Sequence, residues 1–262
     1  MKPDYKNWMP KGMIFGGAVA TVIPAVLLAI FAVGNILSGT AEFIAILILA
    51  VLTFIGFCAT IWMILLYRAF SYNGKRQMSR HIIEGIAEYV SLPDGGKGLD
   101  VGCGSGALTI ACAKRNPKAA LVGIDRWGKE YASFSRSLCE KNAMAEGVSN
   151  VSFTKGDANS LEFPDECFDA VTSNYVYHNI PVKDRQSLLL ETLRVLKKGG
   201  TFAIHDIFSR SKYGDMQAFL KKLRNMGYEK VELIDTTDGS FITKSESVWM
   251  ELAGSALLVG KK

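Results

Sequence analysis

One glycine-rich stretch limits the fold of this chain more than any other segment: Leu99-Asp100-Val101-Gly102-Cys103-Gly104-Ser105-Gly106-Ala107-Leu108-Thr109-Ile110. Its pattern is that of a buried strand end, a turn and the first turns of a helix. The three glycines allow a sharp turn and let a ligand approach the main chain closely. The unpaired N–H groups and the positive dipole end of the following helix would face that ligand. The stretch therefore predicts a site for a nucleotide-like molecule.

Two classes of nucleotide site share this glycine pattern. Gly102, Gly104 and Ala107 also fit the loose dinucleotide fingerprint. Asp125 follows about 20 residues later, where that fingerprint expects a ribose-binding acid. Asp100 favours a different ligand, because a carboxylate inside the turn would repel a pyrophosphate but would accept hydrogen bonds from an ammonium group. We therefore expect a ligand with a cationic end and no phosphate.

An acidic residue followed by Gly-x-Gly-x-Gly resembles motif I of the class I S-adenosylmethionine-dependent methyltransferases. The resemblance implies that S-adenosylmethionine is the cofactor and that the turn holds it. The contacts expected from the turn are Asp100, Gly102, Cys103, Gly104 and Gly106. A nicotinamide-dependent oxidoreductase is the alternative enzyme class, and a structural turn in another α/β protein is the alternative without such a site.

Strands and helices alternate after residue 98, which predicts a parallel sheet with helices on both faces. The expected strands are one ending at 101, then 120–125, 150–154, 168–174, 201–206, 230–234 and 256–260. The expected helices are 107–115, 129–146, 184–196 and 213–226. The resemblance implies a Rossmann-like, mostly parallel sheet of seven strands with an antiparallel last strand. We assign the methyltransferase domain to residues 99–262.

Further cofactor contacts are expected at the carboxyl ends of the next strands, where open α/β sheets bind ligands. Asp125 has two oxygens to accept both hydroxyls of a ribose, and a helix N-cap is its alternative role. Arg126 and Trp127 follow, and one of them is expected to lie against the adenine face. Asp157 is placed to accept from an adenine amino group, with the N–H of Ala158 beside it; an ordinary turn aspartate is the alternative.

The end of the strand at 168–174 supplies Asn174 as the last cofactor contact and, just beyond it, the candidates for catalysis. A sulfonium needs no acid to activate it, so the protein contributes mainly proximity and orientation. A base is needed only if the acceptor loses a proton. His178 is the candidate base and Tyr175 the second catalytic candidate, although a histidine in a loop is often only a hydrogen-bonding residue. His205 and Asp206 are weaker candidates, expected to face the same crevice.

The run Arg194-Val195-Leu196-Lys197-Lys198-Gly199-Gly200 looks like the "RVLKPGG" string that precedes the fifth strand in small-molecule and quinone C-methyltransferases, with Lys198 in place of proline. No Asn-Pro-Pro-Tyr string follows residue 173, so the amino-directed nucleic-acid methyltransferases match poorly. The net charge of +5 and the lack of a basic block also argue against a nucleic-acid partner. Five scattered cysteines without a C-x-x-C pair predict neither a disulfide framework nor a metal site.

Residues 1–67 are expected to form a membrane anchor. The runs 13–37 and 43–67 hold 25 residues each without a charge, against the roughly 20 that cross a bilayer. A short turn with Glu42 joins them, so they predict a hairpin of two transmembrane helices. Basic residues flank the hairpin on both sides and are absent from its turn, which places both termini and the catalytic domain in the cytoplasm. A signal peptide and a soluble helical hairpin are the alternatives.

Residues 68–98 are expected to connect anchor and domain through an amphipathic helix at 75–90 and a loop. Together these features predict a membrane-anchored methyltransferase whose acceptor is small or lipophilic: a phospholipid headgroup, a quinone or an apolar thiol. A non-catalytic membrane sensor that binds S-adenosylmethionine is the alternative from a different class.

Overall fold

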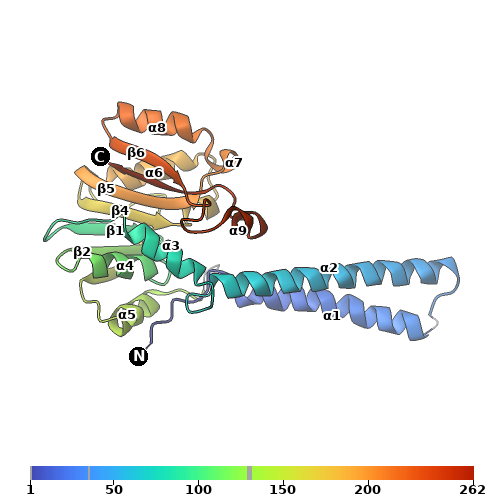
Figure 1. The fold of residues 1–262 in the computed structure, drawn as a ribbon. Helices are drawn as coiled ribbons and strands as arrows, with labels where there is room; N and C mark the ends of the chain where they lie inside the picture. Colours follow the sequence, from blue (N-terminus) through green and yellow to red (C-terminus); the bar gives the residue numbers. More distant parts are fainter. Residues whose placement is uncertain (1, 35, 129–131) are drawn as a thin grey trace. The chain divides into compact units, whose positions relative to one another are not determined.

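A computed structural model describes residues 2–34, 36–128 and 132–262. The described chain forms two compact units (Figure 1). One is residues 7–77; the other combines residues 2–6 with residues 78–262.

The first unit is a helical hairpin of α1 (Lys11–Gly34) and α2 (Thr40–Phe70). Both helices are long and apolar enough to cross a membrane, and most of their large apolar side chains are exposed. The helices touch through small residues: a Cβ on Gly56 would lie 3.0 Å from the carbonyl oxygen of Ala20, and the hydroxyl oxygens of Thr21 and Thr60 lie 3.1 Å apart. Close approach at small residues and bonds between hydroxyls are typical of helix pairs in membranes.

The hairpin differs from expectation at its turn. Asn35, inside the first expected span, lies outside the described residues. α2 already begins at Thr40, so Glu42 lies in its first helical turn rather than in the connecting turn. The positive end of the helix dipole favours an acidic residue there.

The second unit contains the expected seven-stranded sheet, in the order β3-β2-β1-β4-β5-β7-β6. The strands are β1 (Lys97–Val101), β2 (Ala120–Asp125), β3 (Val151–Lys155), β4 (Phe168–Asn174), β5 (Leu196–Ile207), β6 (Glu229–Asp235) and β7 (Ser255–Lys261). β7 runs antiparallel to both of its neighbours, and the other pairs are parallel. The α/β Rossmann-like fold predicted from the sequence is confirmed.

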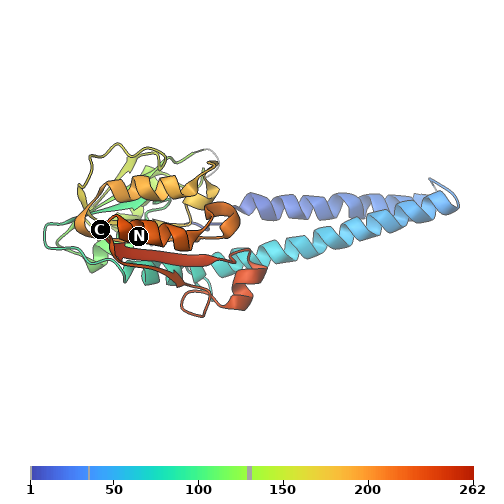
Figure 2. The ribbon, with the colours of Figure 1, turned by 90° about the horizontal axis from the view of Figure 1, so that it is seen from above.

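Helices cover both faces of this sheet (Figure 2). They are α3 (Met78–Ala87), α4 (Ala107–Arg115), α5 (Arg136–Ala145), α6 (Arg185–Arg194), α7 (Arg210–Tyr213), α8 (Met216–Asn225) and α9 (Lys244–Trp249). α3 is the expected amphipathic helix: Ile82 and Ile86 on its inner face are fully buried.

Two expected helices have different bounds in the structure. The one expected at 129–146 begins at Arg136, where the Ser135 side chain caps it by accepting the N–H of Leu138, and residues 129–131 lie outside the described chain. The one expected at 213–226 begins only at Met216, as α8, because Asp215 caps it; Tyr213 instead ends the separate short helix α7, which stops at Gly214. Asp215 accepts the N–H of Ala218, which satisfies one of the unpaired donors of a helix start.

The third difference lies before the fifth strand. The helix expected to reach residue 196 ends at Arg194, and β5 already begins at Leu196. The Lys-Lys-Gly-Gly run at 197–200 therefore lies within the strand as an irregularity in its pairing with β4. Gly199, at φ 80°, supplies the left-handed backbone that such an irregularity needs.

Candidate cofactor and acceptor site

The glycine turn, residues 102–106, joins the end of β1 to α4 at the carboxyl edge of the sheet. The N–H of Gly102 donates to the carbonyl of Ile124 at 2.8 Å, which holds the turn against β2. Gly102 has φ 75°, and a Cβ there would lie 2.3 Å from the Val176 side chain. Around Gly104, at φ 57°, the nearest atoms to such a Cβ are those of the Phe134 ring at 3.8 Å. The turn is therefore packed at its first glycine and more open at its second.

Asp125, at the end of β2, lies directly against this turn. One carboxylate oxygen accepts the N–H of Gly104 at 2.9 Å, and the other accepts the N–H of Trp127 at 2.7 Å. The Trp127 indole N–H donates back to the Gly104 carbonyl at 2.9 Å. The fold thus brings Asp125 to the glycine turn, as the sequence spacing predicts. The indole of Trp127 stabilises the turn through its hydrogen bond to Gly104.

Asp100, just before the turn, and Cys103, within it, are both buried. Asp100 is 1% exposed, and its two oxygens accept the hydroxyls of Thr109 at 2.6 Å and Thr172 at 3.0 Å. Burial raises the pKa of Asp100 to about 6, against the opposing effect of those hydroxyls. In this structure Asp100 is thus buried and held by hydroxyls from α4 and β4.

We expect Asp100→Asn to stabilise the protein at neutral pH. The folded-state pKa of about 6 lies above the unfolded value of 3.8, so the carboxylate lowers stability by about 3 kcal/mol as pH rises from 4 to 6. The amide has nearly the same shape and carries no charge to desolvate. Thermal unfolding at about pH 7.5 should show a higher Tm for the variant, with the gap closing near pH 4. A lower Tm at both pH values would contradict this account.

Arg126 and Asp157 lie together where β2 and β3 end. Arg126 Nε is 3.9 Å from a carboxylate oxygen of Asp157, and both side chains are half-exposed. Asp157 also accepts the backbone N–H of Asn159 at 2.9 Å, which together with the Asn159 side-chain amide lowers the pKa of the carboxyl. Ala158 is buried beside it. Asp157 is thus a turn aspartate in this structure, and the exposed part of its carboxylate remains accessible to the adenine of a cofactor.

His178 and Asp206 form a hydrogen-bonded pair next to the end of β4. His178 lies in the 3₁₀ turn η2 (Tyr177–Asn179), and its Nδ1 is 2.5 Å from Asp206 Oδ1. The second oxygen of Asp206 accepts the N–H groups of Tyr177 at 2.9 Å and His178 at 3.2 Å. Burial alone would raise the pKa of Asp206, but the bond and charge of His178 outweigh it and keep the pKa lowered.

The pair has the geometry of an oriented base. An ionised Asp206 accepts a hydrogen bond from the Nδ1–H of His178, so Nε2 is left as the acceptor. Nε2 has no hydrogen-bond partner among the residues that the structure describes, and 13% of the imidazole side chain is exposed. Asp206 is fully buried, which corrects the expectation that it faces the crevice: it acts on His178 instead.

His205 is also turned inward, contrary to expectation. It is fully buried, with Nδ1 2.9 Å from Asn174 Oδ1 and Nε2 3.0 Å from the Thr236 hydroxyl. Burial lowers the pKa of His205 to about 3, so the ring is neutral and fixes the Asn174 amide from behind. The Tyr175 hydroxyl pairs with Ser255 at 2.7 Å, and burial raises the pKa of the phenol. The Tyr175 phenol therefore keeps its proton at neutral pH.

Two residues of α5 that sequence reasoning did not single out also hold the turn. Cys139 Sγ donates to the carbonyl of Gly104 at 3.2 Å, and Asn142 Nδ2 donates to that of Ser105 at 3.0 Å. Their spacing of three residues places them on one helix face, but only the tertiary fold shows what that face meets.

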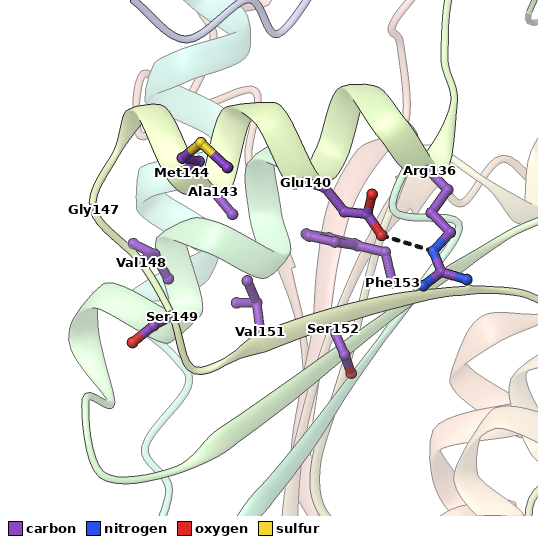
Figure 3. A pocket seen from close by; sticks show the side chains of 10 residues that line it. All are labelled: Arg136, Glu140, Ala143, Met144, Gly147, Val148, Ser149, Val151, Ser152 and Phe153. Atoms are coloured by element: carbon purple, nitrogen blue, oxygen red, sulfur yellow. Dashed lines mark hydrogen bonds and ion pairs between the residues drawn. The ribbon is translucent and has the colours of Figure 1, made fainter. Parts of the chain in front are cut away.

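A surface hollow of about 620 Å³ is lined by residues of α5, of β3 and of the loop between them (Figure 3). The ion pair of Arg136 and Glu140 lies at one end of it and Met144 and Val148 at the other. No predicted cofactor or catalytic residue lines this hollow. It is separate from the carboxyl edge of the sheet, where the residues described above gather.

Comparison with known proteins gives a consistent result. A family model described as a methyltransferase domain matches residues 92–250. A demethylmenaquinone methyltransferase of Bacillus velezensis is 30% identical over 132 residues, covering 50% of this chain and 54% of the relative. A sterol 24-C-methyltransferase of Gibberella zeae is 30% identical over 146 residues, covering 55% of this chain and 36% of the relative. The chain thus spans about half the length of the first relative and about a third of the second.

Among solved structures, the [4+2]-cyclase SpnF superposes with a TM-score of 0.55 at 20% identity, covering 73% of this chain and 85% of that one. At this identity the likeness shows a shared fold alone.

Proposed function

The chain belongs to the methyltransferase domain family, with S-adenosylmethionine as its methyl donor, and on that premise we propose that it methylates a small lipophilic acceptor at a membrane. The observation that carries the proposal is the covalent union of a methyltransferase unit with a hairpin whose apolar side chains are exposed. Relatives named for a menaquinone precursor and a sterol support an acceptor of the quinone or polycyclic lipid type. The family match removes the nicotinamide-dependent oxidoreductase as an alternative.

We place the cofactor at the carboxyl edge of β1, β2, β3 and β4. The glycine turn would approach it through its main chain, and the carboxylate of Asp125 would accept its ribose hydroxyls. The proposed contacts are Asp100, Gly102, Cys103, Gly104, Gly106, Asp125, Arg126, Asp157, Ala158 and Asn174. Asp100 is buried, so it acts in this set through its charge rather than at the surface.

The bound donor supplies an activated methyl group. The chain's own part is to align the acceptor and, where the acceptor is an acidic carbon or hydroxyl, to take its proton. We assign that step to Nε2 of His178, whose resulting imidazolium is stabilised by the buried carboxylate of Asp206 at 2.5 Å. Because Tyr175 keeps its proton, its role is limited to shaping the site.

We further propose that α1 and α2 span a membrane and that the methyltransferase unit is cytoplasmic. At about 1.5 Å per residue the 31 residues of α2 extend about 46 Å, more than the roughly 30 Å hydrocarbon layer. The last turn of α2, with Arg68, would thus emerge on the side where the basic residues gather.

A cysteine-labelling experiment tests this topology. In a variant whose native Cys58 is replaced by serine, cysteines placed at Lys2 and at Ser38 report on the two ends of the hairpin. We expect a membrane-impermeant maleimide to label position 38 in intact cells and position 2 only after lysis. Labelling of position 2 in intact cells would overturn the orientation.

The activity itself is tested with the full chain in lipid nanodiscs and S-adenosylmethionine carrying a tritiated methyl group. Demethylmenaquinol, a sterol and phosphatidylethanolamine serve as parallel acceptors, with Asp125→Ala as the inactive control. We expect the tritiated methyl group to appear in the organic extract of the reaction that contains demethylmenaquinol. If the protein binds the cofactor but moves label to none of the three, the non-catalytic sensor becomes the better interpretation.

A further inference from the structure

Residues 2–6 pack onto the methyltransferase unit, although the whole hairpin separates them from it in sequence. Asn142 Oδ1 accepts the backbone N–H of Asp4 at 2.7 Å, and Asn142 Nδ2 donates to the carbonyl of Asp4 at 3.0 Å. One side-chain amide thus pairs both backbone groups of residue 4. Tyr5 is 4% exposed, and its hydroxyl donates to Glu146 at 3.1 Å. The segment is therefore docked by a buried ring and three hydrogen bonds.

The same amide reaches the glycine turn. The second Nδ2 proton of Asn142 goes to the carbonyl of Ser105 at 3.0 Å, while Asn142 itself is 2% exposed. Cys139, one turn earlier, donates to the carbonyl of Gly104. One face of α5 thus carries Cys139 and Asn142, with Glu146 at the C-cap, and links two successive carbonyls of the turn to residues 4 and 5.

We propose that the segment 2–6 positions the cofactor-binding turn, acting through Asn142. The idea rests on the proposed contact between the turn and S-adenosylmethionine. With its oxygen and both amide protons occupied, Asn142 has a single orientation, and removal of residue 4 leaves a buried acceptor and donor unpaired. The turn has three glycines at positive φ, so its own backbone preference is weak and it depends on such bonds to hold one conformation.

A turn that is ordered before the cofactor arrives binds it more tightly, because less conformational entropy is lost on binding. The segment and Asn142 are therefore positioning elements that touch no substrate. In the same way, the cofactor should make the segment harder to detach, since coupling between two binding events is reciprocal.

The test is a double-variant cycle on the full chain in detergent, read by calorimetric titration with S-adenosylmethionine. Deletion of residues 2–5 and Asn142→Ala should each weaken binding about fivefold to tenfold, the loss of a buried hydrogen bond or two. Because both changes break the same link, the combined variant should bind no more weakly than Asn142→Ala alone. Lys141→Ala, an exposed neighbour on α5, is the matched control and should bind as wild type does.

Hydrogen exchange without cofactor gives a second readout. The amides of Gly104 and Gly106 should exchange faster in the deletion variant, while those of β4 should be unchanged. Unaltered affinity and exchange in the deletion variant, or additive losses in the double variant, would overturn the proposal. If the wild-type protein itself did not bind S-adenosylmethionine, the proposed function would be contradicted rather than the positioning role of segment 2–6. The wild-type titration therefore distinguishes the two outcomes.

Discussion

Asp125→Ala is expected to weaken S-adenosylmethionine binding by about 100-fold or more in a protein that remains folded. The wild-type carboxylate would accept two hydroxyls of the ribose, and hydrogen bonds to a charged group each contribute about 1.5–3 kcal/mol. The structure adds a second loss. The same oxygens hold the N–H groups of Gly104 and Trp127, so the turn would also lose part of its support.

Two further variants separate these effects. Asp125→Asn keeps one carbonyl acceptor without the charge and should lie between alanine and wild type. Trp127→Phe removes the indole bond to Gly104 but leaves the carboxylate, so it should cost much less than Asp125→Ala. Calorimetric titration gives the affinities, and circular dichroism confirms folding. Wild-type affinity in a folded Asp125→Ala protein would remove the ribose assignment.

The parts of this site that are local in sequence could be predicted. The glycines of the turn could be predicted because most other residues are disfavoured in left-handed backbone. Gly102 and Gly106 do have φ values of 75° and 82°. Asp125 follows from the position of a strand end. Since parallel strands end at the same edge of a sheet, the closeness of Asp125 to Gly104 follows from the fold class.

The parts that depend on burial could not be predicted in the same way. A strand end shows which residues are near the crevice but not which face each side chain takes, because that depends on the layers above and below the sheet. His205 and Asp206 are neighbours in β5, and both proved buried. The hydrogen bond between His178 and Asp206 joins the turn after β4 to the end of β5. No spacing between residues in the sequence predicts such a pair.

Tertiary pairing also overrode a strong local signal. The Lys-Lys-Gly-Gly run favours a turn by composition, yet pairing of Leu196 with Phe168 of β4 extends β5 back to Leu196. By contrast, the sequence does contain a signal for the break between α7 and α8. Gly214 is a typical helix end, and Asp215 after it is a typical N-cap residue.

For an acceptor that must lose a proton, His178→Ala is expected to lower kcat by about a hundredfold or more, the usual contribution of a positioned general base. The affinity for S-adenosylmethionine should change little, because His178 bonds to Asp206 and to no residue of the glycine turn among those the structure describes. Single-turnover methyl transfer in nanodiscs and calorimetric titration measure the two quantities separately.

Asp206→Asn tests whether the buried carboxylate orients that base. The Asn amide can donate to Nδ1 of His178, which would move the imidazole proton to Nε2 and remove the acceptor. We expect kcat to fall nearly as far as in His178→Ala, and the double variant to be little worse than either, since the two residues act as a unit. Tyr175→Phe, which loses the bond to Ser255, should retain most of the wild-type kcat. A kcat within twofold of wild type for His178→Ala would mean that the acceptor is methylated without a protein base.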